Sequence, residues 1–330
     1  MELNKIYCMD NLELLKQLPD ESISLIYCDI LYNTGRKFKD YDDKLGTPQQ
    51  AMKWYKPRLI EMKRVLKDTG SIYLQCDWHL NSYLRILMDN IFGINNFKRD
   101  IIWKKTTKTT NIKNYGSEYD NILFYTKGAK YTFNQQYKEI KESELRTKYI
   151  YLEKENGSIM RLNKKQKHGI EDIPKGRIFR AVPLTNMNPN RPNLKYEFLG
   201  YNRVWSVKKE VMKKLQEDGL IFQINGGLPY KKGYLDENKG AKINDVWVDI
   251  NPINSQASER AGYDTQKPKE LLERIIKASS NEGNIVADFF CGSGTSMVVA
   301  KELGRQYIGC DINPRAVEIT NKRLKGEAYE

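Results

Sequence analysis

Short apolar runs alternate with segments of helical periodicity through the first 130 residues. The apolar runs, rich in Ile, Leu, Tyr and Cys, have the length and composition of buried strands. Between them apolar residues recur at helical spacing, as Trp54, Leu59, Met62 and Leu66 do in a helix expected to end at Gly70. We expect strands within 5–10, 24–30, 71–77, 100–105 and 120–128, and helices within 11–20, 51–70 and 80–93.

The alternation stops near residue 131 and resumes at 265. In between, Pro, Asn and Gly clusters such as "PLTNMNPNRPN" and "INGGLPYKKGY" separate short, irregular pieces, which predicts a loop-rich insertion. Alternating strands and helices on either side predict an α/β fold with a mainly parallel sheet. The later helices are expected at 267–280, 294–304 and 314–324, and the strands at 284–290 and 306–312.

Composition narrows the class of protein. Hydrophobic residues make up 40% and charged residues 29% of the chain, as in soluble globular proteins. No apolar run approaches the roughly 20 residues that cross a bilayer. The start, "MELNKIYCMD", is not a basic-then-apolar leader. We therefore expect a cytoplasmic protein without a membrane partner.

The net charge of +13 is concentrated in the middle of the chain. Residues 127–250 contain 25 Lys and Arg against 15 Asp and Glu, interleaved with Tyr, Phe, Trp and Asn. This pattern suits a polyanion-binding surface, although a solvated lysine-rich surface would look similar. Five scattered cysteines without a CxxC spacing and only two histidines predict no metal site and no disulfide framework.

A nucleotide-type cofactor site is indicated by "VADFFCGSGTSMVVAKELGRQYIGCDI" (286–312). An expected strand ends at Asp288, and a turn with Gly292 and Gly294 leads into a helix. Glycines there let the backbone approach a ligand closely. Asp311, 19 residues after Gly292, ends the next strand, where an acid can bind ribose hydroxyls. A structural glycine turn without a ligand is the alternative.

Two stretches in this half resemble a known family. "DFFCGSGT" resembles the FxGxG signature of the S-adenosylmethionine-dependent amino-methyltransferases of DNA, with Phe289 where proline is usual. "TQKPKELLERII" resembles the family's motif X, in which Lys267 would line the methionine end of the cofactor, where a carboxylate needs a cation. The resemblance implies that S-adenosylmethionine is held by Asp288, Phe289, Phe290, Gly292, Gly294, Thr295, Asp311, Lys267 and Gln266.

The family's other signature is a strand-ending D/N/S-P-P-Y/F/W loop, and "DILY" (29–32) resembles it. The surrounding stretches "YKPRLIEMKRVLKDTGSIYLQCDWH", "IFGINNFKRDIIWKK" and "YDNILFYTKG" are similar to further family motifs in the same order. With the catalytic loop first and the cofactor loop last, the chain resembles the β-class. This implies a circularly permuted Rossmann-like sheet of seven, mostly parallel strands. The implied parts are a catalytic half (1–130), a target-recognition insertion (131–250) and a cofactor-binding half (251–330).

The resemblance assigns catalysis to three residues. Asp29 and the carbonyl of Ile30 would accept hydrogen bonds from the amino group of a flipped-out base, and Tyr32 would stack on its ring. Ile30 and Leu31 replace two prolines, which removes a restriction on φ but leaves the carbonyl in place. We therefore expect a working site. A structural role is expected for His79, and core positions for Trp54, Trp78 and Trp103.

Double-stranded DNA is the partner that the resemblance implies. Asn33 and Thr34 beside the catalytic loop, Lys108 and Lys113 in "KTTKTTNIKNYG", and Arg191 in "PNRPNLKY" are predicted to contact the target base or the DNA. The resemblance also implies a homodimer. No PD-(D/E)xK cleavage pattern stands out, so a restriction endonuclease would be a separate protein.

Methylation of adenine at N6 is the expected reaction, because the resemblance associates Asp at position 29 with adenine. Methylation of cytosine at N4 is the alternative within the same chemistry. A catalytically inactive module that binds S-adenosylmethionine and DNA is an alternative of another class. A nicotinamide oxidoreductase is disfavoured by the order of the motifs and by the "CGSGTS" turn, which lacks the third glycine of GxGxxG.

Overall fold

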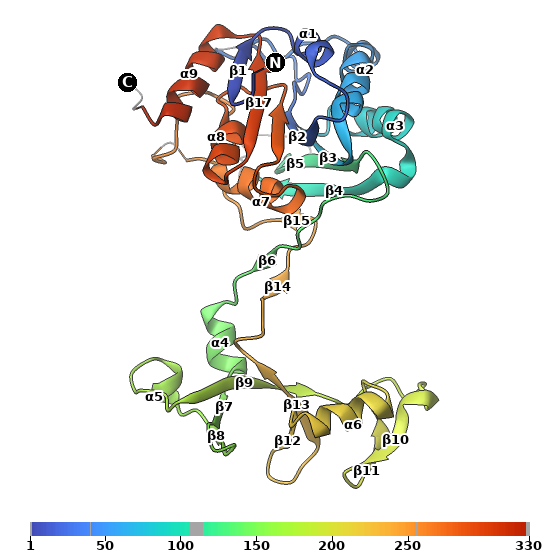
Figure 1. Ribbon diagram of the computed structural model, residues 1–330, viewed down its shortest axis with the longest axis vertical. Helices are drawn as coiled ribbons and strands as arrows, with labels where there is room; N and C mark the ends of the chain where they lie inside the picture. The colour runs from blue at the N-terminus through green and yellow to red at the C-terminus, as the bar shows by residue number, and fades with distance from the viewer. Residues whose placement is uncertain (1, 40, 106–114, 255, 328–330) are drawn as a thin grey trace. The chain divides into compact units, whose positions relative to one another are not determined.

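The chain forms two compact units (Figure 1). The structure is a computed structural model that describes residues 2–39, 41–105, 115–254 and 256–327. Unit 1 comprises Met1–Gln136 and Ile243–Glu330, and unit 2 comprises Tyr137–Lys242. Unit 2 is thus inserted into the sequence of unit 1. Its boundaries lie a few residues inside the interval 131–250, where the sequence pattern changes.

Unit 1 is built on an eight-stranded sheet of order β1-β17-β16-β2-β3-β5-β4-β15 within the described residues. Only β5 runs opposite to the others, so the sheet is mostly parallel and the α/β prediction is confirmed. The strands are β1 (Lys5–Cys8), β2 (Ile23–Asp29), β3 (Leu66–Cys76), β4 (Phe97–Lys104), β5 (Tyr119–Thr126), β15 (Val246–Trp247), β16 (Ile285–Asp288) and β17 (Gln306–Asp311).

The sheet has one strand more than the seven predicted. The additional strand is β15, whose two residues pair in parallel with Ile102 and Trp103 of β4. A strand of two residues is too short to produce a readable hydrophobic period. It is held in place by packing instead, since Trp247 is buried in the core.

Helices cover both faces of this sheet (Figure 1). One group packs against the N-terminal half of the unit, and the other group comes from the C-terminal half. The first group is α1 (Asn11–Gln17), α2 (Pro48–Val65) and α3 (Asn81–Phe92), followed by the short 3-10 helix Ile94–Asn96. The second group is α7 (Lys269–Ser279), α8 (Thr295–Glu302) and α9 (Pro314–Lys325).

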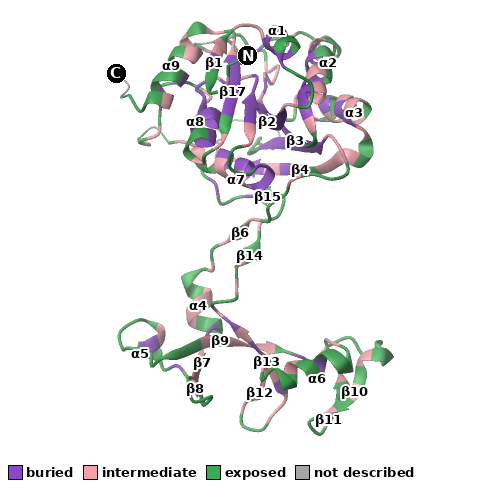
Figure 2. Ribbon diagram, in the orientation of Figure 1, coloured by how far each residue is buried: buried purple, intermediate pink, exposed green. Residues whose placement is uncertain are grey.

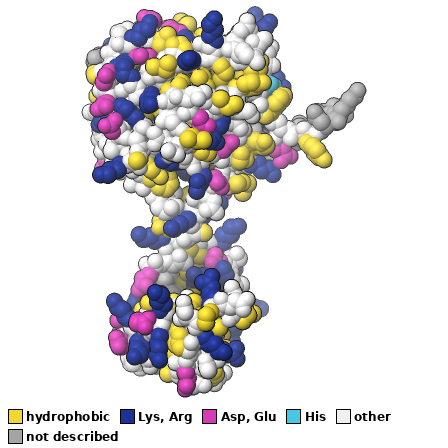
Figure 3. Space-filling model, turned by 90° about the vertical axis from the view of Figure 1, so that its right-hand side faces the viewer, with side chains coloured by type: hydrophobic (Ala, Val, Ile, Leu, Met, Phe, Trp, Pro, Cys, Tyr) yellow, Lys and Arg dark blue, Asp and Glu magenta, His cyan; other side chains and the backbone are white. Residues whose placement is uncertain are grey.

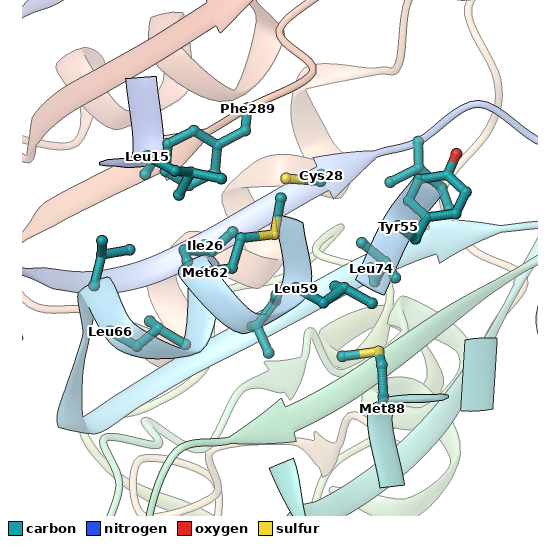
Figure 4. Packing of buried hydrophobic residues seen from close by; sticks show 14 of the residues in the cluster. Leu15, Ile26, Cys28, Tyr55, Leu59, Met62, Leu66, Leu74, Met88 and Phe289 are labelled. Carbon is teal, nitrogen blue, oxygen red and sulfur yellow. The ribbon is translucent and has the colours of Figure 1, made fainter. Parts of the chain in front are cut away.

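Strand β2 shows why both faces are covered. Ile26 and Cys28 pack into the core cluster under α1–α3, whereas Leu25 and Tyr27 pack into the cluster under α7 and α8. Successive side chains of a strand point to opposite faces, so a continuous apolar run needs cover on both. Figure 4 shows the first cluster with Met62 of α2 beside β2, and Figure 2 shows burial concentrated in the central strands. Each fully buried aliphatic side chain contributes about 1.5–3 kcal/mol.

The two halves of unit 1 meet where β16 lies beside β2. Val286 and Ala287 of β16 pair in parallel with Leu25 and Ile26 of β2, although the two strands are far apart in the chain. Both strands therefore end at the same edge of the sheet. Ligands of open α/β sheets bind outside the carboxyl ends of the strands. This edge is the expected location of a site.

Helix α2 ends earlier than predicted. It begins with a capping box at Thr47 and ends at Val65, rather than at Gly70. Leu66 already has an extended backbone and pairs with Ile23 of β2. Pairing with the neighbouring strand thus overrides the helical spacing of apolar residues at this end.

Unit 2 contains a five-stranded antiparallel sheet of order β12-β13-β9-β7-β8 and two small clusters of buried residues, one around Phe179 and one around Trp205. Most of its strands have only two to four residues, which explains why the sequence gives a weak periodic signal. Its elements are β6 (Tyr137–Lys138), α4 (Glu142–Lys148), β7 (Tyr151–Lys154), β8 (Ile159–Arg161), α5 (Lys164–Lys167), β9 (Gly176–Pro183), the 3-10 helix Pro192–Leu194, β10 (Lys195–Phe198), β11 (Tyr201–Val204), α6 (Lys209–Glu217), β12 (Ile221–Gln223), β13 (Pro229–Tyr234) and β14 (Ala241–Lys242).

Two searches of the described ranges gave no hit. None of their helices is both long and apolar enough to pass through a membrane. In the same ranges, no group of three or more His, Cys, Asp or Glu side chains is placed to hold a metal ion.

Candidate active site

A cavity of about 600 Å³ lies in unit 1 at the carboxyl ends of β2, β16 and β17. A pocket of this size is within the range of small-molecule and cofactor sites. Gly294, which was predicted to bind the cofactor, lies outside its lining. The predicted residues that do line the cavity are Asp29, Ile30, Tyr32, Thr34, Gln266, Lys267, Asp288, Phe289, Phe290, Gly292, Thr295 and Asp311.

The glycine turn after β16 depends on backbone conformations that favour glycine. Gly292 and Gly294 both have positive φ, of 51° and 71°. A Cβ on Gly294 would overlap with the side chain of Thr320 on α9. The Thr320 hydroxyl in turn donates to the Gly292 carbonyl oxygen at 3.1 Å. Gly294 therefore brings α9 close to the turn, whereas Gly292 faces the cavity.

Asp288 organises the turn from inside. Its carboxylate accepts hydrogen bonds from the Phe290 backbone N–H at 2.9 Å and from the Ser296 hydroxyl. Burial raises the pKa of Asp288 to about 7, and the two hydrogen bonds act in the opposite direction. The carboxylate is thus used to hold the loop between β16 and α8.

Asp311 is the acid at the end of β17. Its carboxylate accepts hydrogen bonds from the backbone N–H of Gly292 at 2.9 Å and of Asn313 at 2.9 Å. Burial raises the pKa of Asp311, while these backbone N–H groups lower it. Its side chain lines the cavity and remains partly accessible, as an acceptor for ribose hydroxyls requires.

The other predicted cofactor residues have structural contacts as well. Phe289 is fully buried, and its carbonyl accepts from the Asn11 side chain at 3.1 Å. The Thr295 hydroxyl accepts from the Arg323 guanidinium at 2.8 Å. The Gln266 side chain bridges the backbone of Glu259 and Ala261. Phe290 lies against Trp54 and Tyr55 of α2. These side chains shape the walls.

Asp29, at the end of β2, is the centre of the catalytic half. One carboxylate oxygen accepts the Tyr32 hydroxyl at 2.7 Å, and the other forms an ion pair with Lys267. Burial raises the pKa of Asp29, and the Lys267 ammonium opposes this shift. Lys267 was predicted to line the methionine end of the cofactor. It does line the cavity, but its ammonium contacts Asp29.

The loop after Asp29 is held without prolines. Ile30 is buried and its backbone N–H donates to the Gln75 carbonyl oxygen of β3 at 3.3 Å. The Leu31 carbonyl accepts the Tyr55 hydroxyl of α2 at 2.7 Å. Packing and these hydrogen bonds replace the restriction that two prolines would impose on φ.

Sequence reasoning missed a second buried carboxylate beside Tyr32. Asp120 of β5 lies 3.1 Å from the Tyr32 hydroxyl, accepts the Gln75 side chain at 3.0 Å and forms an ion pair with Lys105. The ammonium groups of Lys267 and Lys105 lie over the Tyr32 ring, 5.7 and 5.9 Å from its centroid. The only sequence signal was an acid at the start of an otherwise apolar strand.

The predicted DNA-contacting residues are scattered. The Asn33 side chain bonds to the backbone of Gly46 and Leu45, so it folds its own loop. Asp43, which sequence reasoning missed, accepts from the backbone of Asn33 and from the backbone and hydroxyl of Thr34. Arg191 is exposed in unit 2. Lys108 and Lys113 lie outside the described residues.

The expected core tryptophans have three different environments. Trp103 is buried, and its indole N–H donates to the Ile250 carbonyl oxygen at 3.0 Å. Trp54 is half-buried under the Arg58 guanidinium. Trp78 is 61% exposed, so the prediction of a core position was wrong. It follows β3 directly in the loop to α3, where no apolar face covers it.

The fold and the cavity define an α/β protein with an adenosine-type cofactor site beside an acidic strand end. The family model described as DNA methylase matches residues 23–322, and the chain belongs to this family of N6/N4 methyltransferases. The resemblance given by the sequence is thereby confirmed. The family is one of S-adenosylmethionine-dependent methyltransferases, in agreement with the predicted cofactor. Membership also excludes the nicotinamide oxidoreductase.

Several known proteins are similar to this chain. Type II methyltransferase M.EcaI of Enterobacter cloacae is 29% identical over 97% of this chain and 69% of its own length. DNA adenine methyltransferase YhdJ of Escherichia coli K12 is 28% identical over 96% of this chain and 80% of its own. The chain also matches type III restriction-modification Mod subunits, of which it spans about half the length.

A solved structure supports the fold. TTHA0409 of Thermus thermophilus, described as a DNA modification methylase and complexed with S-adenosyl-L-methionine, has a TM-score of 0.51 and 15% identity. The likeness covers 98% of this chain and 93% of that one. At this identity it bears on the fold alone.

Proposed function

We propose that the protein transfers the methyl group of S-adenosylmethionine to the 6-amino group of adenine in a base flipped out of double-stranded DNA. One observation carries the proposal. The strand end with Asp29 and Tyr32 lines the same cavity as the glycine turn and Asp311. A methyl donor bound at the turn and a base bound at Asp29 would therefore be neighbours.

The cavity residues fit S-adenosylmethionine. Gly292 leaves backbone accessible to a ligand, and the Asp311 carboxylate is an acceptor for ribose hydroxyls. Lys267 supplies a cation for the methionine carboxylate, at the cost of its ion pair with Asp29. When bound, the cofactor supplies an electrophilic methyl group on a positively charged sulfur.

The remaining chemistry belongs to the chain itself. The amine of adenine is a weak nucleophile, because its lone pair is delocalised into the ring. Asp29 and the Ile30 carbonyl would accept its two N–H hydrogens, which favours the tetrahedral nitrogen needed for attack. Tyr32 would fix the ring plane by stacking. The base reaches this site only after flipping, which costs a few kcal/mol.

Adenine is proposed over cytosine on two grounds. The first is the Asp at position 29, which the family resemblance associates with adenine. The second is the name of a relative, DNA adenine methyltransferase YhdJ. Cytosine N4 methylation would use the same acceptors, so only the product separates the two.

Unit 2 is proposed as the target-recognition part. It contains 23 Lys and Arg against 13 Asp and Glu. Figure 3 shows Lys and Arg side chains over the visible face of this unit. Neutralising phosphates in this way makes DNA affinity fall with salt. A homodimer and a separate restriction endonuclease complete the proposed partners, the latter suggested by the restriction-modification names of relatives.

The test uses purified protein, tritiated S-adenosylmethionine and a pool of mixed-sequence duplexes, followed by analysis of the labelled nucleosides. Label in 6-methyladenine supports the proposal, and label in 4-methylcytosine replaces adenine by cytosine. Absence of label, with cofactor and DNA still bound, would favour an inactive binding module.

The matched variants are Asp29→Ala and Asp68→Ala. Asp68 also follows a segment of unit 1, but its side chain is 78% exposed and lies outside the cavity lining. Methylation should disappear in Asp29→Ala and persist in Asp68→Ala. Equal activity in the two variants would contradict the assigned role of Asp29.

A further inference from the structure

Trp78 differs from the other tryptophans in its exposure. Trp103, Trp205 and Trp247 are at most 5% exposed and Trp54 is half-buried, whereas Trp78 is 61% exposed. Single exposed apolar residues are common on surfaces and need no function. Three further observations about its surroundings point beyond this.

One face of the indole is covered by His79. The two rings are stacked, with centroids 3.8 Å apart and planes 26° from parallel. Since one face of Trp78 is covered, its exposed area lies on the edges and on the opposite face. The side chain therefore presents a flat aromatic surface to solvent.

The stack is fixed in place. His79 Nδ1 lies 2.9 and 3.0 Å from the two Asp77 carboxylate oxygens, and the His79 backbone N–H donates to Asp77 at 3.0 Å. The Asp77 carbonyl accepts from the backbone of Leu80 and Asn81, at the start of α3. A surface held this way loses little conformational entropy when a ligand binds.

The platform is next to the candidate active site. Asp77 lines the same cavity as Asp29, and Gln75 is the β3 residue that pairs with Asp29 of β2. Trp78 follows Gln75 by three residues, which span at most about 11 Å. Two cations, Arg36 and Lys105, also line this cavity and suit a polyanion.

We infer that Trp78, backed by His79, is a stacking site for a nucleobase of the DNA strand next to the flipped base. The inference rests on the proposed function and adds to it a contact in unit 1, outside the catalytic loop. Aromatic side chains stack on any base, because every base has a π-face. The contact therefore contributes affinity without choosing the sequence.

Intrinsic fluorescence tests the inference directly. A mixed-sequence single-stranded 20-mer, whose bases are free to stack, should quench the fluorescence of the wild-type protein. Heparin, a polyanion without bases, should bind without this quenching. In Trp78→Phe the quenching should be lost, while DNA affinity is largely kept because an aromatic face remains.

Affinity for the same oligonucleotide provides the second readout. Trp78→Ala should raise Kd by about 5- to 150-fold, corresponding to 1–3 kcal/mol per stacked base. Ile86→Ala, which truncates a 63% exposed side chain on α3, is the matched control and should leave Kd unchanged. Unchanged Kd in Trp78→Ala, or equal quenching in Trp78→Phe and wild type, would overturn the inference.

Failure of this inference is distinguishable from failure of the proposed function. Trp78→Ala should bind S-adenosylhomocysteine like the wild type, as measured by calorimetry. Asp29→Ala should lose methylation but keep the fluorescence quenching. Quenching that survives while no variant or wild type methylates DNA would support the stacking site and contradict the enzyme.

Discussion

The Lys267 ammonium contacts the Asp29 carboxylate, although the two residues lie 238 positions apart in the chain. Together with the Tyr32 hydroxyl, this ion pair occupies both carboxylate oxygens. A base amine needs one of these oxygens. We therefore expect a carboxylate-bearing cofactor to compete for Lys267 and to make Asp29 accessible.

Replacing Lys267 should shift the pH dependence of methylation. Burial raises the pKa of Asp29 and Lys267 lowers it, so Lys267→Met should raise this pKa further. Asp29 accepts hydrogen bonds as a carboxylate, and activity is lost when pH falls through its pKa. The acid limb should therefore move to higher pH. Single-turnover rates at saturating cofactor, between about pH 5 and 9, measure it.

Lys269→Met is the control for this shift. Lys269 lies two residues away and pairs with Glu302 outside the cavity. Its removal should leave the acid limb in place. An acid limb that moves to lower pH in Lys267→Met would show that Lys267 does not stabilise the charged form of Asp29.

Gly294→Ala should lower the free energy of unfolding by more than a glycine replacement usually does. The new Cβ would meet the Thr320 side chain, and φ is 71°. Gly304→Ala has the same φ of 71°, but its nearest neighbour is an exposed Glu282 carbon 3.7 Å away. Both should lose about 1–2 kcal/mol from φ, and Gly294→Ala should lose more. Urea denaturation gives both values, and equal losses would contradict the steric argument.

Asp288→Asn should reduce the pH dependence of stability. The folded-state pKa of about 7 exceeds the unfolded value near 3.8, so the folded state holds the proton between these values. Wild-type stability should then fall as pH rises from about 4 to 7, by at most roughly 1.4 kcal/mol per pH unit for this group. Asparagine accepts the same hydrogen bonds without ionising. Denaturation at the two ends of the window would refute this if both proteins lost equal stability.

Arg191→Gln should weaken DNA binding in a salt-dependent manner. If Arg191 contacts a phosphate, its loss reduces the slope of log Kd against log salt by about 0.9. Arg177→Gln is the comparison, because Arg177 is already paired with Asp236 and Glu237. Titrations at several salt concentrations test both variants. The same slope in Arg191→Gln and wild type would remove Arg191 from the DNA contacts.

Much of the fold could be predicted because its signals are local. The strand with Ile26 and Cys28 on one face and Leu25 and Tyr27 on the other has a continuous apolar run, typical of a parallel sheet buried on both sides. The two-residue strand β15 and the early end of α2 were missed. Both depend on pairing with a neighbouring strand, which local periodicity does not contain.

The sequence by itself determined the α/β class, the order of the catalytic and cofactor loops and the family, since motifs of adjacent residues carry them. Only the tertiary structure decided that Lys267 pairs with Asp29, that Asp120 lies beside Tyr32 and that Trp78 is exposed. The physical reason is that pair contacts and exposure depend on which surfaces pack together. Residues 88 or 238 positions apart acquire a distance only when the sheet forms.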